Sequence, residues 1–595
     1  MKKYFLFVVV LIVLVMSAHW PALKAGFVWD DTALVLRDPL IRSWRLIPES
    51  FEQPLFLDAT PSNFYRPLQR ASYTLDYAFA AFRPFTYHLT NILLHAAAAI
   101  ALFAFALSLL ALFGSEPRAR FWVAAFATTA WALHPLHSAV VDYVAGRADS
   151  LAALFGFLGL YFSIRAVQRG GRAAWKCFAA ATLAFLLAAL SREIGLVFPL
   201  IALVIIALRK SWLALTPALI VVVFVGVVYG ALRAQMPVVN VPRFTPPAPL
   251  ILRPLLAARA LAEYAGLIVL PINLHVERNV EEHAWGLSNA ELASGAMREL
   301  QTCGGAICLA LLLFWLVRAW RRDPLVATLL LASLIAYLPV CGIFPLNANC
   351  AEHWVYLPLA FFLLAAARAL ARVSQSSLTG SALMAAIALV WMTFFGVRSF
   401  YRAQDWRDAR TFFERTIASG GDSARMFINL AGLELQEHHL ERAEALLKVA
   451  LQKSPQQPFA LLNLAAIAIE RGKFDDARKL LAEAAKEPVA VAQADELLAV
   501  ITLKETGKLD LIRWRLAAYD TGTTWKIERR YVTALEQSGA RDKAIAELRA
   551  TLVLQWYRAE TWQLLGEELA KAGRTSEAAS ALAEAHDFDV HLGDR

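Results

Sequence analysis

The stretch NLAGLELQEHHLERAEALL, residues 429–447, returns in similar form as NLAAIAIERGKFDDARKLL, residues 463–481. The two stretches begin 34 residues apart, and the small residue Ala443 of the first recurs as Ala477 of the second. Small residues at such positions let two antiparallel helices approach closely. The spacing therefore predicts a helix–turn–helix unit that repeats along the C-terminal part of the chain.

The same period appears again near the C-terminus, where Gly539 recurs as Gly573. A helix–turn–helix period of this length is typical of tetratricopeptide repeats, which stack into an α-solenoid. We expect about five units over residues 401–595. The stretch 490–535 matches the pattern poorly and is interpreted as a degenerate repeat. Solenoids of this kind bind many different ligands, so the pattern predicts a docking platform and leaves its ligand open.

Residues 1–400 have a different character. The chain of 595 residues is 58% hydrophobic, with a mean hydropathy of +0.49, which is too apolar for a soluble protein. Apolar runs recur with about the length that a helix needs to cross 30 Å of hydrocarbon. We predict an all-α fold in which a polytopic bundle of about eleven spans precedes the solenoid. The predicted spans are residues 4–18, 88–113, 121–140, 150–164, 177–190, 195–208, 213–232, 303–317, 325–342, 354–371 and 381–399.

The charge of the chain is divided unevenly between these two parts. Residues 401–595 carry 27 Lys and Arg against 30 Asp and Glu, which leaves 31 against 19 for residues 1–400. A basic membrane part indicates anionic lipid head groups as neighbours and argues against nucleic acid. The basic residues fall in alternate short loops, which places the loop 20–87 and the C-terminal tail outside the cytoplasm. On this topology the apolar segment 255–271 is a re-entrant or surface helix on the outer side.

Several common kinds of site have no counterpart in the sequence. It contains no glycine-rich phosphate loop, so nothing indicates a nucleotide-sugar or ATP site of the usual kinds. No Cys or His spacing suggests a structural zinc. Cys341 and Cys350 flank a loop on the predicted outer face, where a disulfide could join them. Cys303 is an equally placed third candidate, so no pairing can be assigned. High Ala and Arg usage suggests a bacterial inner-membrane protein facing the periplasm.

An acidic pair, Asp30–Asp31, lies in AGFVWDDTALVLRDP, residues 25–39, just after the first apolar run. Carboxylates at the mouth of a hydrophobic bundle are costly unless they face water or a reacting group. The predicted topology places many other polar residues at the outer ends of helices. We expect these residues to converge with the pair on one outward-facing cavity: Tyr65, Arg66, His88, His134, His137, Asp142, Arg147, Asp149, Arg192, Glu193, Glu352 and His353.

Each of these residues also has a structural interpretation, which stays open at this point. Charged pairs can exist only to make burial tolerable. The structural interpretations are a cap at His134, a hydrogen-bonded core histidine at His95, ion pairs Arg147–Asp149 and Arg192–Glu193, a helix start at Tyr65–Arg66 and an interfacial turn at Asp30–Asp31.

Seven motifs occur in a fixed order along the chain. They are Phe27-x-Trp29-Asp30-Asp31, Tyr65-Arg66-Pro67-Leu68, His88-Leu89-x-Asn91-x-x-Leu94-His95, His134-Pro135-x-His137, Gly146-Arg147-Ala148-Asp149, Ser191-Arg192-Glu193-x-Gly195 and Ala351-Glu352-His353-x-x-Tyr356-x-Pro358. Together with the repeats, this order resembles the transmembrane and tetratricopeptide repeat-containing O-mannosyltransferase family and its bacterial relatives. One departure is Glu193-Ile194. The eukaryotic members more usually have Lys-Glu-Gln-Gly here, so the Gln of their Glu-Gln pair is Ile194 in this chain. The repeat tail is also shorter, so the sugar and the acceptor stay open.

The resemblance implies a GT-C superfamily glycosyltransferase that uses a lipid-phosphate-linked sugar. Such an enzyme moves the sugar from polyprenyl phosphate to a protein hydroxyl or a glycan, with inversion. Asp30 or Asp31 is the expected base, with Asp31 preferred because it lies deeper in the loop. The donor phosphate is expected to meet Arg66, Arg147 and Arg192, with His134 and His137 as hydrogen-bond donors. Further site candidates are Tyr65, His88, Asp149, Glu193, Glu352 and His353.

No cofactor is required by this chemistry, and no ligand spacing demands a metal, although a divalent metal on the phosphate stays open. Two other functions also stay open. The chain could move a preassembled glycan as a lipid-linked oligosaccharide ligase or polymerase. It could instead be a membrane-anchored scaffold, or a transporter of lipid-linked glycans. A scaffold should tolerate loss of Asp30 and Asp31, whereas an enzyme should not.

Overall fold

The structure is a computed structural model of residues 1–595. It describes all of them except residues 1, 60–61, 240, 242–247, 281–288, 344–345, 347, 349, 375–377, 520–524 and 593–595, and only the helical backbone at 289–294, 373–374, 378–381 and 519. The chain forms two compact units, and each is described by itself. The membrane unit is Met1–Val28, Pro84–Leu232 and Pro247–Gly421, and the repeat unit is Trp29–Arg83, Arg233–Pro246 and Asp422–Arg595.

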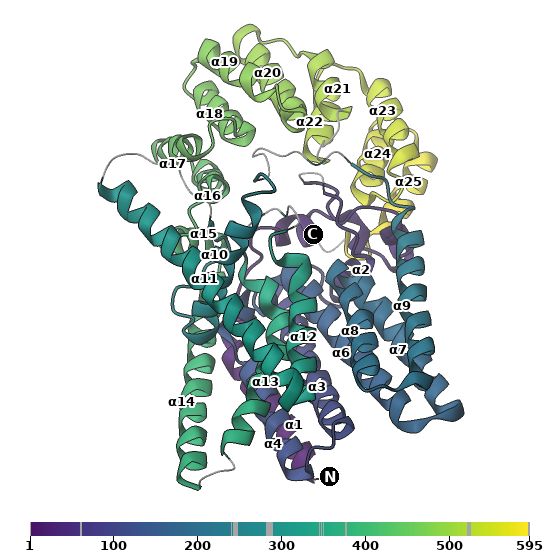
Figure 1. Ribbon diagram of the computed structural model, residues 1–595. Helices are drawn as coiled ribbons and strands as arrows, with labels where there is room; N and C mark the ends of the chain where they lie inside the picture. Colours follow the sequence, from purple (N-terminus) through teal and green to yellow (C-terminus); the bar gives the residue numbers. More distant parts are fainter. Residues whose placement is uncertain are drawn as a thin grey trace. The chain divides into compact units, whose positions relative to one another are not determined.

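The membrane unit is built from helices (Figure 1). Every predicted span corresponds to a helix, and the segment predicted to be re-entrant is a helix too. The helices are α1 (Lys2–Ala18), α3 (Pro84–Leu112), α4 (Pro117–Ala132), α5 (Ser138–Val141), α6 (Arg147–Arg169), α7 (Gly171–Ser191), α8 (Val197–Leu208), α9 (Trp212–Arg233), α10 (Arg253–Val269), α11 (Asn289–Arg322), α12 (Pro324–Tyr337), α13 (Tyr356–Ser374), α14 (Leu378–Ala403) and α15 (Ala409–Ala418).

The predicted count of eleven spans is not confirmed. Within the described residues, seven helices are long and apolar enough to cross a membrane by length and composition. Others of the predicted spans are shorter helices: α8 has 12 residues and α12 has 14. The protein is thus all-α with several helices able to cross a membrane, and its GT-C-like character stays a prediction.

Helix α6 lies at the centre of the membrane unit, because it packs against α3, α7 and α8. Two glycines on α6 make this close approach feasible. A Cβ atom on Gly156 would lie 2.1 Å from the Phe198 ring, and one on Gly159 would lie 2.3 Å from the Phe185 ring. Small residues at such contacts are the usual means by which membrane helices pack tightly. The core of the unit therefore forms around a glycine face.

The predicted span 121–140 is three elements and not one, since the start of α5 also lies in it. Helix α4 ends at Ala132, and a short 3₁₀ helix, Pro135–His137, follows. Proline has no N–H group to continue a helix, and residues before proline avoid helical backbone angles. The His134-Pro135 pair therefore ends α4 and redirects the chain.

The tail of the repeat unit is a series of five helix pairs, which Figure 1 shows following one another in an arc. The residue between helices has a positive φ at His438 (60°), Gly472 (71°), Gly507 (68°), Gly539 (77°) and Gly573 (76°). A left-handed residue just after a helix is a common way to end it. The pairs are α16 (Ala424–Gln436) with α17 (Leu440–Lys453), α18 (Pro458–Glu470) with α19 (Phe474–Ala484), α20 (Val491–Thr506) with α21 (Leu511–Tyr519), α22 (Trp525–Gln537) with α23 (Arg541–Leu554), and α24 (Ala559–Lys571) with α25 (Thr575–Phe588).

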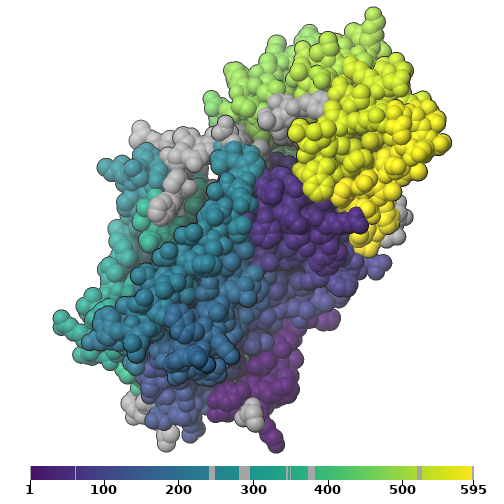
Figure 2. Space-filling model, turned by 90° about the vertical axis from the view of Figure 1, so that its right-hand side faces the viewer, coloured from purple at the N-terminus to yellow at the C-terminus, as the bar shows by residue number. Residues whose placement is uncertain are grey.

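The repeat unit also contains the segment that follows the first apolar helix, Trp29–Arg83. The segment contains several short helical turns between residues 32 and 51, followed by α2, Pro67–Ala80. Its residues Leu40 and Leu46 form one buried cluster with Tyr557, which lies just before α24. Figure 2 shows this purple segment directly beside the yellow surface of the last repeats. The first loop and the repeats thus share a hydrophobic core.

Candidate functional site

The structure divides the predicted site residues between the two units. Asp30, Asp31, Tyr65 and Arg66 belong to the repeat unit, and the other candidates belong to the membrane unit. Convergence of the two groups on one cavity therefore stays a prediction. The geometry within each unit shows what each group can do.

The acidic pair lies at a strained point of the backbone. Trp29, immediately before the pair, has a φ of 49°, which a bulky residue adopts at a cost of about 1–3 kcal/mol. The Arg425 guanidinium of α16 lies 4.9 Å from the centroid of the Trp29 ring. A π-helix, Thr32–Leu36, follows directly, and such turns are frequent at functional sites. Strain and an unusual turn at a pair of carboxylates indicate that their position is tightly specified.

The two carboxylates differ in exposure. Asp31 is fully buried, and Asp30 is half-buried. The backbone carbonyl of Asp30 accepts from the N–H groups of Ala33 (3.0 Å) and Leu34 (2.9 Å). The Asp31 side chain makes no capping hydrogen bond to the π-helix. The two neighbours therefore meet different surroundings, and Asp30 has the greater access to solvent.

Tyr65 and Arg66 precede helix α2, as the interpretation of a helix start expected. Arg66 is the residue before the helix, and Pro67 is its first residue, where the missing N–H costs nothing. The Tyr65 ring is fully buried. Burial raises the pKa of Tyr65 to about 12, although the nearby Arg233 acts to lower it. The phenol therefore stays neutral at physiological pH.

Arg233 is a cation of this region that the sequence reasoning missed. Its guanidinium carbon lies 5.9 Å from the centroid of the Tyr65 ring, and its Nη2 donates to the Asn63 carbonyl at 3.1 Å. The Asn63 amide in turn donates to the Val239 carbonyl at 2.9 Å. One signal was present in the sequence, because the predicted topology puts Arg233 at the outer end of a span, where the positive-inside rule makes a basic residue unexpected.

In the membrane unit, Arg147 is fully buried at the start of α6. Its Nε donates to the Asn91 side-chain oxygen at 2.7 Å, and its Nη2 donates to the Tyr87 carbonyl at 2.9 Å. A Cβ atom on the preceding Gly146 would lie 2.3 Å from the Ala139 carbonyl oxygen. The motif glycine is therefore needed for the close approach that places Arg147. Asn91 accepts a hydrogen bond from Arg147, and although it belongs to one of the seven motifs, no role was predicted for it.

Arg192 forms an ion pair with Asp149. The pair joins the end of α7 to the first turn of α6, and the Arg192 side chain remains 15% exposed. The motif glycine Gly195 is again close-packed, because its Cβ atom would lie 2.3 Å from the Ala188 carbonyl. Asp149 thus pairs with Arg192, a combination that the structural interpretation of the sequence did not contain.

The histidines of the motifs have well-defined neighbours. His134 caps the 3₁₀ helix, since its Nδ1 accepts from the Leu136 N–H at 3.3 Å, and its Nε2 lies 3.2 Å from the Ile268 carbonyl. The His137 ring lies 4.6 Å from the Tyr356 ring, centroid to centroid. His95 has hydrogen bonds to the Tyr356 hydroxyl (2.7 Å) and the Ala132 carbonyl (3.0 Å). The interpretations of His134 as a cap and of His95 as a core histidine are confirmed.

Two other buried polar residues sit nearby in the same unit. The His88 Nε2 lies 3.2 Å from the Gly26 carbonyl. The Asp142 carboxylate lies 2.7 Å from His19 Nδ1 and accepts from the Ser138 hydroxyl at 2.6 Å. These contacts join His88 to Gly26, and Asp142 to His19 and Ser138, so both residues have structural roles.

Glu352 is the centre of a fully buried charged trio. Its two oxygens lie 3.5 Å from Arg278 Nη2 and 3.2 Å from Arg402 Nη2. All three side chains are at most 4% exposed. The neighbouring His353 is packed against Trp354, with ring centroids 6.1 Å apart. Arg278 and Arg402 lie outside every motif, so no sequence pattern pairs them with Glu352.

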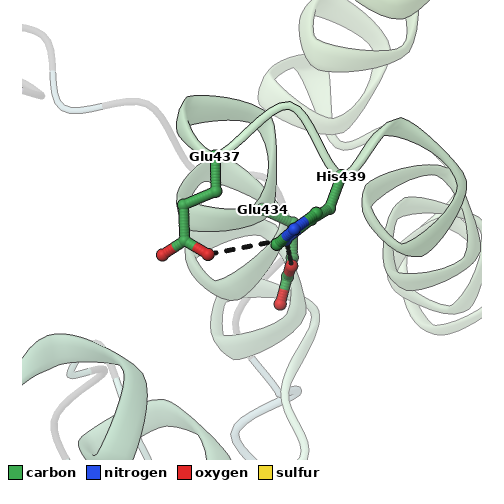
Figure 3. A group of neighbouring side chains, drawn as sticks. All are labelled: Glu434, Glu437 and His439. Carbon is green, nitrogen blue, oxygen red and sulfur yellow. Dashed lines mark hydrogen bonds and ion pairs between the residues drawn. The ribbon is translucent and has the colours of Figure 1, made fainter.

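One group of side chains in the described part of the chain has ligand atoms close enough for a metal, and it lies outside the motifs. Figure 3 shows His439 between the carboxylates of Glu434 and Glu437, at 2.9 and 3.5 Å. Arg442 Nε lies 3.2 Å from the other Glu434 oxygen. The buried Glu434 carboxylate thus already pairs with Arg442 and has a hydrogen bond to His439, so the arrangement is a polar cluster between α16 and α17.

The cysteines left open by the sequence are each unpaired. Cys341 and Cys350 are buried, and Cys303 is exposed.

Comparison with known proteins supports the repeats and the family resemblance. A tetratricopeptide repeat model matches residues 434–501. Human protein O-mannosyl-transferase TMTC3 is 24% identical over 483 residues, which cover 75% of this chain and 50% of the relative. Protein O-mannosyl-transferase Tmtc1 of Drosophila melanogaster is 33% identical over 147 residues, which cover 24% of this chain and 16% of the relative.

Among solved structures, ArnT from Cupriavidus metallidurans bound to undecaprenyl phosphate is 16% identical, with a TM-score of 0.35 over 84% of this chain and 80% of ArnT. The chain spans about half the length of the human and mouse TMTC3 proteins that it matches. The resemblance predicted from the seven motifs is confirmed: the chain is similar in sequence to the TMTC protein O-mannosyl-transferases and carries tetratricopeptide repeats.

Proposed function

We propose that the protein is a membrane glycosyltransferase that moves a sugar from a polyprenyl-phosphate-linked donor to a hydroxyl group of a protein or a glycan. The observation that carries the proposal is the sequence similarity to protein O-mannosyl-transferases over 75% of this chain. An acidic pair in a strained and partly exposed segment supports it further.

In the proposed reaction, Asp30 or Asp31 accepts the proton of the acceptor hydroxyl as the hydroxyl oxygen attacks the anomeric carbon. The bond from that carbon to the phosphate oxygen breaks, and its electron pair leaves with the polyprenyl phosphate. One displacement of this kind inverts the anomeric centre. Asp31 lies deeper in the loop, but Asp30 is the more exposed carboxylate and so the better placed to meet an acceptor.

The leaving phosphate gains negative charge, which cations in a partly dry site stabilise. The residues proposed for this role are Arg66, Arg147 and Arg192, with His137 as a hydrogen-bond donor. His134 is left out, because its Nδ1 accepts from the Leu136 N–H and its Nε2 lies 3.2 Å from the Ile268 carbonyl. Arg233 joins them, because it lies beside Tyr65 in the same unit as Arg66. The partial exposure of Arg66 and Arg192 supports direct contact with the donor. The burial of Arg147 on Asn91 and Tyr87 supports a role in shaping the site.

The segment Trp29–Arg83, which contains the Asp30–Asp31 pair and is called the acidic loop below, packs with the repeats in one compact unit. This supports placing both on one side of the membrane. We place that side in the periplasm of a bacterial inner membrane, because basic residues gather in the alternate loops. The repeats then serve to dock the acceptor close to the acidic pair. The reaction itself requires no cofactor, and a divalent metal on the phosphate is tested by adding a chelator to the assay.

The experiment that tests the proposal uses membranes that contain the full chain. They are incubated with radiolabelled polyprenyl-phosphate mannose, and label is followed into protein and glycan fractions. In parallel, glycans and glycoproteins are profiled in a deletion strain and in an Asp30→Ala/Asp31→Ala strain. We expect the two strains to lose the same products. Loss of a preassembled glycan that is moved from lipid diphosphate would indicate a ligase or polymerase instead. Unchanged products in the double variant would indicate a scaffold.

A further inference from the structure

The last helix pair of the solenoid is joined to the acidic loop by a buried ion pair. Arg558, just before α24, donates from Nη1 and Nη2 to the two oxygens of Asp58, each at 2.8 Å. The side chains are 4% and 7% exposed. Burial by itself would lower the pKa of the Arg558 guanidinium, but Asp58 holds that pKa above its ordinary value. A bidentate pair of this kind fixes geometry as well as charge.

A second group of polar contacts joins the acidic loop to the last helix pair, near the C-terminus. Asp589 is fully buried and accepts from the Tyr77 hydroxyl at 2.6 Å. Arg42 Nη1 lies 3.5 Å from the other Asp589 oxygen and also pairs with Glu560 of α24. The Ser43 hydroxyl donates to the Asp587 carbonyl at 3.0 Å. The hydrophobic cluster of Leu40, Leu46 and Tyr557 fills the space beside these contacts.

These contacts differ from the ion pairs within the solenoid. Arg549 of α23 pairs with Glu577 of α25, and those side chains are 47% and 46% exposed. The outer face of a terminal repeat is normally polar and open to water, because its role is to cap the stack. Here the contact between the end of the stack and the loop buries two arginines, Arg558 of the stack and Arg42 of the loop. Stacking alone does not require that burial.

The anchored residues are close in sequence to the acidic pair. Arg42 follows the π-helix Thr32–Leu36 by a few residues, and Asp38 lies between them. Asp38 is held by Arg70 of α2 at 2.8 Å, and both side chains are at most 2% exposed. The loop between the acidic pair and α2 is thus fixed to α2 and to α24–α25.

We propose that α24–α25 are a positioning element for the transfer reaction, which hold the acidic loop through Arg558, Asp58, Arg42 and Asp589. The inference rests on the proposed function, since the loop is taken to carry the base. Arg558 and Asp58 are positioning residues: they act on the reaction through the loop backbone. The solenoid then has a second role besides docking, because its last pair completes the site.

The test compares Arg558→Ala, Arg558→Lys and the matched control Arg549→Ala in the full chain. Hydrogen exchange of residues 30–58 is measured together with transfer from polyprenyl-phosphate mannose and binding of that donor. In Arg558→Ala we expect exchange in the loop to rise at least about tenfold, with exchange in α16–α19 unchanged. Transfer should fall about 10- to 100-fold, because small displacements of a reacting group have effects of this size. Donor binding should remain, so kcat falls more than KM changes.

Arg558→Lys keeps the charge but not the bidentate geometry, so it should fall between wild type and Arg558→Ala. Arg549→Ala should match wild type in every measurement. Unchanged loop exchange in Arg558→Ala would overturn the proposal, as would a mobile loop with wild-type transfer. If the wild-type protein transfers no sugar, the proposed function is wrong, and the exchange results still decide whether α24–α25 hold the loop.

Discussion

Two sets of charged motif residues, one in each unit, meet different surroundings. In the membrane unit the Glu352 carboxylate is fully buried between Arg278 and Arg402, whereas in the repeat unit Asp30 and Arg66 keep part of their surface exposed. Moving a charge out of water costs several kcal/mol, which only a well-placed partner offsets. The difference shows that polar motif residues in an apolar sequence are of two kinds. Some hold helices to one another, and others keep part of their surface exposed.

The largest expected effect breaks the buried trio. Glu352→Gln keeps the shape of the side chain but leaves two arginines without their shared carboxylate. We expect a loss of about 3–5 kcal/mol in stability, seen as reduced protein in the membrane and a lower unfolding temperature in detergent. Normal abundance combined with lost transfer would instead indicate that Glu352 takes part in the reaction. Glu352 would then not differ in role from Asp30 and Arg66.

The next prediction concerns the exposed side of the comparison. Arg66→Gln should lower transfer about 10²–10³-fold with normal abundance, because one charge-assisted contact to the leaving phosphate is lost. Arg83→Gln, in the same loop and exposed, is the control and should transfer at the wild-type rate. Transfer assays and immunoblots of the same membranes decide the matter. An Arg66→Gln protein that is absent from the membrane would give Arg66 the structural role assigned to the trio.

A smaller effect is expected where a motif glycine places a buried arginine. In Gly146→Ala the new methyl group would lie 2.3 Å from the Ala139 carbonyl oxygen, so α6 and Arg147 must shift. Overpacking of this kind costs about 1–3 kcal/mol. Gly226→Ala on α9 is the matched control, since nothing lies within 4 Å of its Cβ position. Equal unfolding temperatures for the two variants would show that the close approach at Gly146 has no energetic weight.

The smallest effect is expected for the surface pairs of the solenoid. Glu444 has hydrogen bonds to Lys448 and Arg471, which lower its pKa to about 2. Its contribution to stability is therefore present above the ordinary carboxyl pKa and is lost as pH falls through about 2. Because the group is screened by water, Glu444→Gln should cost less than about 1 kcal/mol at neutral pH. A larger loss of unfolding free energy in denaturant would mean that surface pairs also hold the repeats together.

Much of the helical framework was predictable, because its causes are local. Apolar runs and a 34-residue spacing report directly on helices, and Ala443 and Ala477 are fully buried in the repeats as expected. The stretch 490–535 matched the pattern poorly because its turn glycine, Gly507, lies 35 residues after Gly472 and 32 before Gly539, and not 34 from each. Pro135 was a local signal that should have ended the predicted span 121–140 early.

The site was less predictable, because its contacts join distant parts of the chain. Arg558 and Asp58 are 500 residues apart in sequence, and no local sequence pattern around either residue predicts its contact with the other. The same holds for Glu352 and Arg278. Motif residues identified where charge gathers, but only the fold shows which charges are paired. The predicted roles of Asp30, Asp31 and the phosphate-binding residues remain to be tested by experiment.

The central claim is that the acidic pair supplies the base for sugar transfer. It is tested most directly by measuring transfer from polyprenyl-phosphate mannose, and binding of the same donor, in Asp30→Asn and Asp31→Asn. Loss of a general base lowers the rate about 10²–10⁴-fold, and the amide keeps the shape of the loop. We predict that one of the two variants loses transfer while both still bind the donor. Wild-type transfer rates in both variants would contradict the claim, and loss of donor binding together with transfer would assign the pair to the phosphate or a bound metal instead.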